Sequence, residues 1–165
     1  MNMSYRRQVL ALTDTELESF VRAWTSQKVQ NSQYESCQNF AGPGDMGRDV
    51  VGFLSQDKHE GDWHNYQCKQ YDSNLPTDKA ILDIGKIIYY ASQGFFTLPT
   101  QTNFVAPKGI NRNLSTLIYD PSKMKDFLKE NPCFFFFFCN LLQGKISLLI
   151  YSLTYNVDIL FVLLF

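Results

Sequence analysis

This chain of 165 residues lacks a surplus of charge of either sign. Fifteen Lys and Arg oppose sixteen Asp and Glu, so no overall field draws the chain to nucleic acid or to an anionic membrane. A nuclease needs only a local basic face, so DNA binding stays open. The cysteines form no CxxC pair and no zinc-ligand spacing with histidine, which argues against a disulfide framework or a zinc knuckle. They are Cys37, Cys68, Cys133 and Cys139.

The first twelve residues also lack an apolar run of the length that a signal peptide needs. Together with the unpaired cysteines, this absence leads us to expect a cytoplasmic protein with reduced thiols. The length suffices for one domain with a substantial core and is too short for two.

The composition divides the chain in two near residue 131. Up to that point, charges of both signs are interspersed with Gly and Pro, as in a soluble α/β domain. Beyond it only Lys145 and Asp158 carry a formal charge, and Phe, Leu, Ile, Tyr and Val dominate. The sequence therefore predicts a folded domain over residues 1–131 and a hydrophobic tail over residues 132–165.

Three interpretations compete for the tail. Residues 146–165 have about the length of a membrane helix, but Asp158 and Asn156 lie within them and no anchoring residue follows. A buried strand pair does not suit the unbroken run Phe134–Phe138. The interpretation that we favour is a frameshift or read-through product, because T-rich DNA encodes runs of phenylalanine. Membrane attachment is not expected, although the tail leaves it open.

The pattern of residues 1–131 predicts helices and strands in alternation. Thr13 to Glu16 has the composition of a helix start with a capping residue, and Thr77 is expected to cap a later helix with a clear apolar stripe. This order of elements predicts an α/β fold, in which helices flank a small mixed β-sheet. The expected elements are helices at 13–27, 34–40, 77–94, 114–118 and 121–129, and strands at 49–53, 63–71 and 103–107.

Two of these strands carry a pattern suited to metal-dependent chemistry. Asp49 begins the first, and Gln67 and Lys69 lie on one face of the second, with Cys68 on the other face. If the strands are neighbours, these side chains converge at one end of the sheet. The Asp49 carboxylate and the Cys68 backbone carbonyl could then hold Mg²⁺, or Mn²⁺, which accepts few protein oxygens and keeps several waters. Lys69 would orient or help to deprotonate a water and offset phosphate charge.

The segment Gly44–Val51, followed by Tyr66–Lys69, resembles the GxDV…QxK pattern of Mrr-like restriction endonucleases in the PD-(D/E)xK superfamily. Glutamine commonly replaces the acidic residue before x-Lys in that subgroup, as Gln67 does here. The resemblance covers roughly residues 13–107 and implies a restriction-endonuclease-like core and a Mg²⁺-dependent DNA endonuclease.

The resemblance also implies roles for individual residues. Asp49, Gln67 and Lys69 would be catalytic, together with an acidic residue of the first helix. Glu18 matches that acidic position best, with Glu16 as a competitor. The implied metal ligands are the side chains of Asp49 and Glu18 and the backbone carbonyl of Cys68.

A longer stretch, reaching the helix that contains Gly85–Tyr90, is also similar to nuclease-like effectors of bacterial anti-phage defence operons. In those proteins a C-terminal interaction domain normally follows. The polar sequence here stops near residue 131, so we expect that domain to be missing, and with it the contact to other components of a defence operon.

Further basic residues are candidates to contact DNA phosphates. These are Arg48, Lys86, Lys108 and Arg112. Each candidate site residue also has an ordinary explanation, as a turn residue, a solvated lysine or a plain helix acid, and Asp45 is expected to shape its turn rather than to bind metal. The alternative function is a catalytically inactive nucleic-acid-binding or scaffold module with the same fold.

Overall fold

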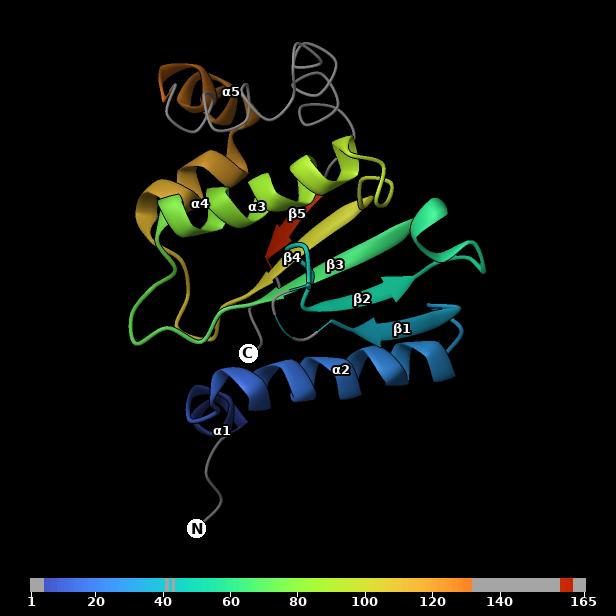
Figure 1. Cartoon of the computed structure of the whole chain (residues 1–165). Coiled ribbons are helices and arrows are strands. Elements are labelled where there is room, and N and C mark those ends of the chain that lie inside the picture. The colour runs from blue at the N-terminus through green and yellow to red at the C-terminus, as the bar shows by residue number, and fades with distance from the viewer. Residues whose placement is uncertain (1–4, 41, 43, 132–157, 162–165) are drawn as a thin grey trace.

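The computed structural model describes residues 5–40, 42, 44–131 and 158–161, and shows a mixed α/β chain. A twisted sheet lies between two layers of helices (Figure 1). Helices α1 (Tyr5–Leu10) and α2 (Asp14–Gln30) cover one face. Helices α3 (Thr77–Ser92), α4 (Arg112–Tyr119) and α5 (Pro121–Glu130) lie on the other side. The predicted α/β class with a mixed sheet and flanking helices is confirmed.

The sheet runs in the order β1-β2-β3-β4-β5. Strands β1, β2 and β3 pair antiparallel, whereas β3 pairs parallel with β4, and β4 parallel with β5. Helix α3 lies in the connection between the parallel strands β3 and β4, as such a connection requires. The strand bounds are β1 Ser36–Asn39, β2 Val50–Phe53, β3 Trp63–Cys68, β4 Gln101–Val105 and β5 Asp158–Phe161.

The predicted helix over 34–40 is wrong, because this stretch forms the edge strand β1. Its backbone pairs with β2, with Ser36 opposite Phe53. The tyrosine that precedes it, Tyr34, is buried, and a Cβ atom on Gly52 would lie 2.5 Å from its ring. Contacts between residues far apart in the sequence thus decide the conformation here over a weak local pattern.

The helix starts differ in how well the sequence predicts them. Thr13 caps α2, as expected of this helix start, and forms a capping box with Glu16. Thr77 does not cap α3, because Pro76 holds the cap position and provides no side-chain hydrogen bond. The Thr77 hydroxyl instead donates to Asn111 Oδ1 at 2.9 Å, and the same oxygen caps α4. Thr77 therefore links the starts of two helices.

The two faces of β3 belong to two different hydrophobic clusters. Tyr66 and Cys68 pack with Leu17 and Val21 of α2. Trp63 packs on the opposite face with residues that include Ile87 of α3. Because side chains alternate along a strand, Gln67 lies on the face that α3 covers. This alternation places α3 beside the side chain of Gln67.

Part of the predicted tail is a strand, because β5 pairs with β4 from Gln101 to Phe104. Residues 132–157 and 162–165 lie outside the described residues, and with them the phenylalanine run on which the frameshift and membrane interpretations depend. Among the residues that the structure does describe, no helix has the length and apolar character needed to cross a bilayer.

Candidate active site

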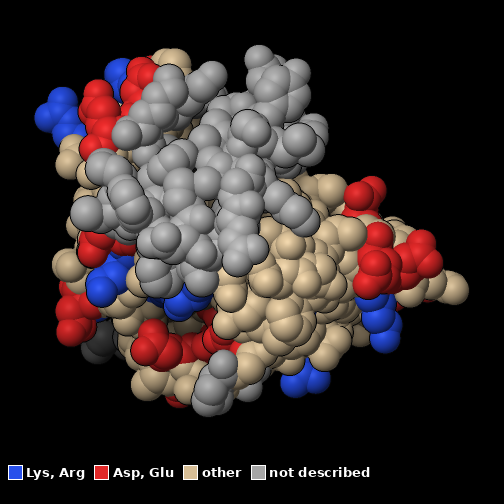
Figure 2. All heavy atoms as spheres, turned by 45° about the horizontal axis from the view of Figure 1, so that its top comes forward, with Lys and Arg blue, Asp and Glu red and all other residues tan. Residues whose placement is uncertain are grey.

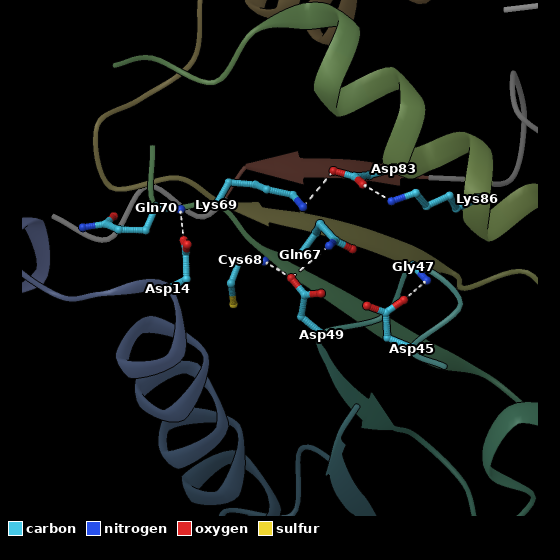
Figure 3. A network of polar contacts seen from close by, with 10 residues as sticks. All are labelled: Asp14, Asp45, Gly47, Asp49, Gln67, Cys68, Lys69, Gln70, Asp83 and Lys86. Atoms are coloured by element: carbon cyan, nitrogen blue, oxygen red, sulfur yellow. Dashed lines mark hydrogen bonds and ion pairs between the residues drawn. The ribbon is translucent and has the colours of Figure 1, made fainter. Parts of the chain in front are cut away.

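The Asp49 side chain joins the two strands at the centre of the candidate site (Figure 3). It directly precedes β2 and is only 7% exposed. Its Oδ2 atom accepts hydrogen bonds from the backbone N–H of Cys68 at 2.7 Å and from Gln67 Nε2 at 2.9 Å. The structure therefore brings together Asp49 and Gln67, which are 18 residues apart in the sequence.

The Asp49 carboxylate lies in an environment that disfavours an isolated negative charge. Burial raises the pKa of Asp49 to about 6, while the Lys69 ammonium and the Cys68 N–H oppose the rise. The carboxylates of Glu18 and Asp45 add to it. A cation beside Asp49 would offset this cost of burial, because an opposite charge favours the ionised form.

Gln67 carries an oxygen that lacks a partner. Its side chain is 3% exposed, and Nε2 donates to Asp49, which fixes the orientation of the amide. The other amide atom, Oε1, is buried and accepts no hydrogen bond within the described part of the chain. A buried polar atom left unsatisfied costs about 1–3 kcal/mol. The site thus holds a carboxylate and, beside it, an unused oxygen donor.

Lys69 follows the last residue of β3 and points toward α3 (Figure 3). Its Nζ lies 2.9 Å from Asp83 Oδ2, and its side chain is 17% exposed. Burial alone would lower the pKa of Lys69, but the carboxylates of Asp83 and Asp49 outweigh this effect, so the pKa is raised. Lys69 is therefore an ammonium ion at neutral pH.

Asp83 is a residue of the site that the sequence analysis missed. It lies on α3 and is buried, and its two oxygens contact Lys69 and Lys86. A signal was present in the sequence: Asp83 lies three residues after the buried Ala80 and four before the buried Ile87, on the packed side of the helix. A carboxylate at such a position requires a partner, since buried charges are almost always paired.

The structure separates the two acidic candidates of α2. Glu16 belongs to the capping box, where its Oε2 accepts from the Thr13 N–H at 2.8 Å. Glu18 is partly buried, and burial raises its pKa, as does the charge of Asp14, while Lys69 lowers it. The charge of Glu18 also raises the pKa of Asp49, so of the two candidates it is Glu18 that interacts electrostatically with the site.

The loop before Asp49 is held by two of its own residues. Asp45 Oδ1 accepts from the Gly47 N–H at 2.7 Å, which is the turn-shaping role expected of Asp45. Arg48 is 6% exposed, and its guanidinium stacks on Phe40 and Phe96 and contacts His59 Nε2 at 3.1 Å. This enclosure does not fit the predicted role of Arg48 at a phosphate groove.

The other predicted DNA contacts lie nearer the surface. The Lys86 side chain is 47% exposed and pairs with Asp83 at 3.3 Å. Lys108 pairs with the exposed Asp72 at 3.4 Å, and Arg112 is exposed at the start of α4. On the face drawn in Figure 2, the basic and acidic side chains of the described residues are interspersed. They form no continuous basic field there.

The donor atoms of the site fit a cation that takes few protein ligands. Within the described residues, no three His, Cys, Asp or Glu side chains cluster as a metal-holding group. The donors present are the Asp49 carboxylate and the unpartnered Gln67 Oε1, with Glu18 nearby. Mg²⁺ binds through one or two carboxylates and keeps several waters, which such a set allows. The Cys68 thiol packs in the core on the α2 face, so only its main chain belongs to the site.

Comparisons with protein-family models, with curated proteins and with solved structures find no match to this chain. The mixed α/β architecture is therefore established by the structure itself. A narrower class of protein is indicated only by the geometry of the site and by the motif that its residues form.

Proposed function

We propose that this chain is a metal-dependent DNA endonuclease of the Mrr-like PD-(D/E)xK type, acting in restriction or anti-phage defence. The observation that carries the proposal is the position of Asp49 Oδ2, which is bonded to both Gln67 Nε2 and the Cys68 N–H. These are residues of the GxDV…QxK motif, and Lys69 completes it on the same side of the sheet as Gln67. Motif and geometry thus support the same chemistry.

The proposed roles follow from the charge and burial of each group. Asp49, Gln67 Oε1 and Glu18 would hold Mg²⁺ or Mn²⁺, with the Cys68 carbonyl as a further donor. When bound, such an ion supplies Lewis-acid chemistry at the scissile phosphate and makes water more acidic. Lys69 is held as an ammonium ion by Asp83, so its part is to offset the charge that develops on the phosphate. In this arrangement Lys69 acts as a cation and not as a base.

The substrate in this proposal is DNA, bound in the cytoplasm. The chain carries no net positive charge, so binding depends on a few local cations rather than on a general field. Lys86, Lys108 and Arg112 are the proposed phosphate contacts. Arg48 is left out of this set because it is enclosed by aromatic rings.

The test is cleavage of supercoiled plasmid by the full chain with Mg²⁺, with EDTA as the control. We expect Asp49→Ala and Lys69→Ala each to lose cleavage by at least about a hundredfold, since each removes a charged group at the reacting phosphate. Asp57→Ala and Lys79→Ala change exposed residues of the same types and should retain it. Undiminished cleavage in both site variants would remove the basis of the proposal.

The second candidate is a module of the same fold that binds nucleic acid without cutting it. Gln67 favours this alternative, because a neutral amide at the ligand position is a weaker metal donor than a carboxylate. Duplex DNA bound equally well in Mg²⁺ and in EDTA, with no nicking of plasmid in either, would favour the module over the enzyme.

A further inference from the structure

Asp83 lies outside the motif, yet its carboxylate is the direct partner of the motif lysine (Figure 3). We propose that Asp83 is a positioning residue, which holds the Lys69 ammonium at the place where the scissile phosphate binds. This inference rests on the proposed nuclease function and adds to it a residue of α3.

The ion pair with Asp83 restricts the freedom of the Lys69 side chain. A lysine has four flexible methylene groups, and Lys69 lies just beyond the last residue of β3. The 2.9 Å ion pair to Asp83 Oδ2 fixes its end, although the side chain is still 17% exposed. The Lys69 ammonium is thus held beside the site and remains within reach of a ligand.

Asp83, which holds Lys69, is itself fixed in place. Asp83 is near the middle of the 16-residue helix α3, which packs on the sheet through Ile87. Its second oxygen, Oδ1, contacts Lys86 at 3.3 Å, one turn further along the helix. With both oxygens engaged, the Asp83 carboxylate has a defined orientation, and it transmits that orientation to Lys69.

Helix α3 also contacts the loop that carries Asp49. A Cβ atom added to Gly47 would lie 3.0 Å from Lys86 Cβ, so the helix and the loop are in close contact. Gly47 has a φ of +84°, which favours glycine in any case. The same turn of α3 therefore sets the position of Lys69 and limits the position of the Asp49 loop.

A plain counter-charge for a buried lysine is the competing explanation. Both explanations predict that Asp83→Asn weakens the fold, because Lys69 would lose its partner. They differ for Asp83→Glu, which keeps the negative charge and moves the carboxylate outward by one methylene. A counter-charge still works from there, whereas a positioning residue would place the ammonium wrongly.

The experiment measures kcat and KM for plasmid cleavage by the full chain as wild type, Asp83→Asn, Asp83→Glu and Asp78→Asn. Asp78 is an exposed acid of the same helix and serves as the matched control. We expect kcat to fall about tenfold to a hundredfold in both Asp83 variants, with KM within about twofold, since misplacing a reacting group costs rate rather than binding. Asp78→Asn should stay within about twofold of wild type in both constants.

A second measurement does not depend on activity. Acylation of lysines by a succinimidyl ester, followed by mass spectrometry, reports how well each amine is held. We expect Lys69 to react several-fold more slowly than the exposed Lys79 in the wild type, and to approach Lys79 in Asp83→Asn. If Asp83→Asn proves too unstable for kinetics, the labelling rates of Lys69 and Lys79 can still be compared in the wild type, and kcat can still be measured for Asp83→Glu.

The outcomes separate the inference from the function on which it rests. Wild-type cleavage with kcat unchanged in Asp83→Glu overturns the positioning role and leaves the nuclease standing. Equal labelling of Lys69 and Lys79 in the wild type also overturns it. Absence of Mg²⁺-dependent cleavage by the wild type ends the proposed function, and the positioning role of Asp83 ends with it.

Discussion

Replacement of Gln67 by glutamate tests the site most directly, because the expected loss of stability depends on whether a metal is present. Without metal, Gln67→Glu puts a second carboxylate where an N–H donor now lies 2.9 Å from Asp49 Oδ2. Loss of a hydrogen bond to a charged group, together with repulsion between two buried carboxylates, should lower the free energy of unfolding by about 2–4 kcal/mol. For a chain of this size, that corresponds to a drop in Tm of roughly 5–15 °C.

With Mg²⁺ the same variant should gain more stability than the wild type. Two carboxylates bind a divalent cation better than a carboxylate and an amide do, and a ligand at a hundred times its Kd stabilises the fold by about 2.7 kcal/mol. We therefore expect Mg²⁺ to recover much of the lost Tm in Gln67→Glu. The wild type, with one carboxylate fewer, should gain less.

The assay is thermal unfolding in EDTA and in a series of Mg²⁺ concentrations. Gln38→Glu, on the edge strand β1 and exposed, makes the same chemical change away from the site and should respond to neither condition. Equal stability of Gln67→Glu and wild type in EDTA would refute the Asp49–Gln67 contact. An equal response of both to Mg²⁺ would refute Gln67 as a ligand position.

Three further predictions concern stability and DNA binding. Burial, followed by the charges of Arg48 and Lys58, lowers the pKa of His59 to about 4. The stability that His59 contributes should therefore be complete above about pH 6.5 and be lost as the pH falls to 4, by up to about 3 kcal/mol; urea unfolding of wild type minus His59→Gln across this range should show that loss, and a flat difference would contradict it. Gly52→Ala places a Cβ 2.5 Å from the Tyr34 ring and should cost about 1–3 kcal/mol, which a denaturant midpoint equal to that of the wild type would disprove. Removing the charges of Lys108 and Arg112 should reduce the salt dependence of duplex binding, by about 0.9 in slope for each phosphate that is no longer neutralised, and fluorescence anisotropy with an unchanged slope would exclude both residues from the DNA interface.

The sequence predicts the central elements well because their signals are local. The apolar stripe of α3 and the alternation in β3 lie within single segments, and both elements form close to the expected bounds. Strand β1 was missed because its pairing with β2 and the fit of Tyr34 over Gly52 join residues far apart in the chain. The cap of α3 was misassigned for the same reason, since Thr77 bonds to Asn111 instead.

The candidate site likewise has residues that the sequence predicts and residues that it does not. The motif placed Asp49 and Gln67 on adjacent strands, and the structure brings them into contact. The contact of Asp83 with Lys69 becomes visible only once the packing of α3 on β3 is known. An acidic residue on the packed side of the helix does indicate that it has a buried partner, but not which one. Arg48 is a residue type that often contacts phosphate, but the aromatic rings of Phe40 and Phe96 enclose its guanidinium. A prediction based on residue type alone has no means to foresee such an enclosure.

The position of β5 has a consequence for any shortened form of the protein. Strand β4 pairs with β3 on one side and with Asp158–Phe161 on the other. A chain that stopped at residue 131 would leave one row of β4 amides and carbonyls open to solvent, and an open strand edge is a template for self-association. The unusual composition of the last segment thus does not make it dispensable, because four of its residues cover the edge of β4.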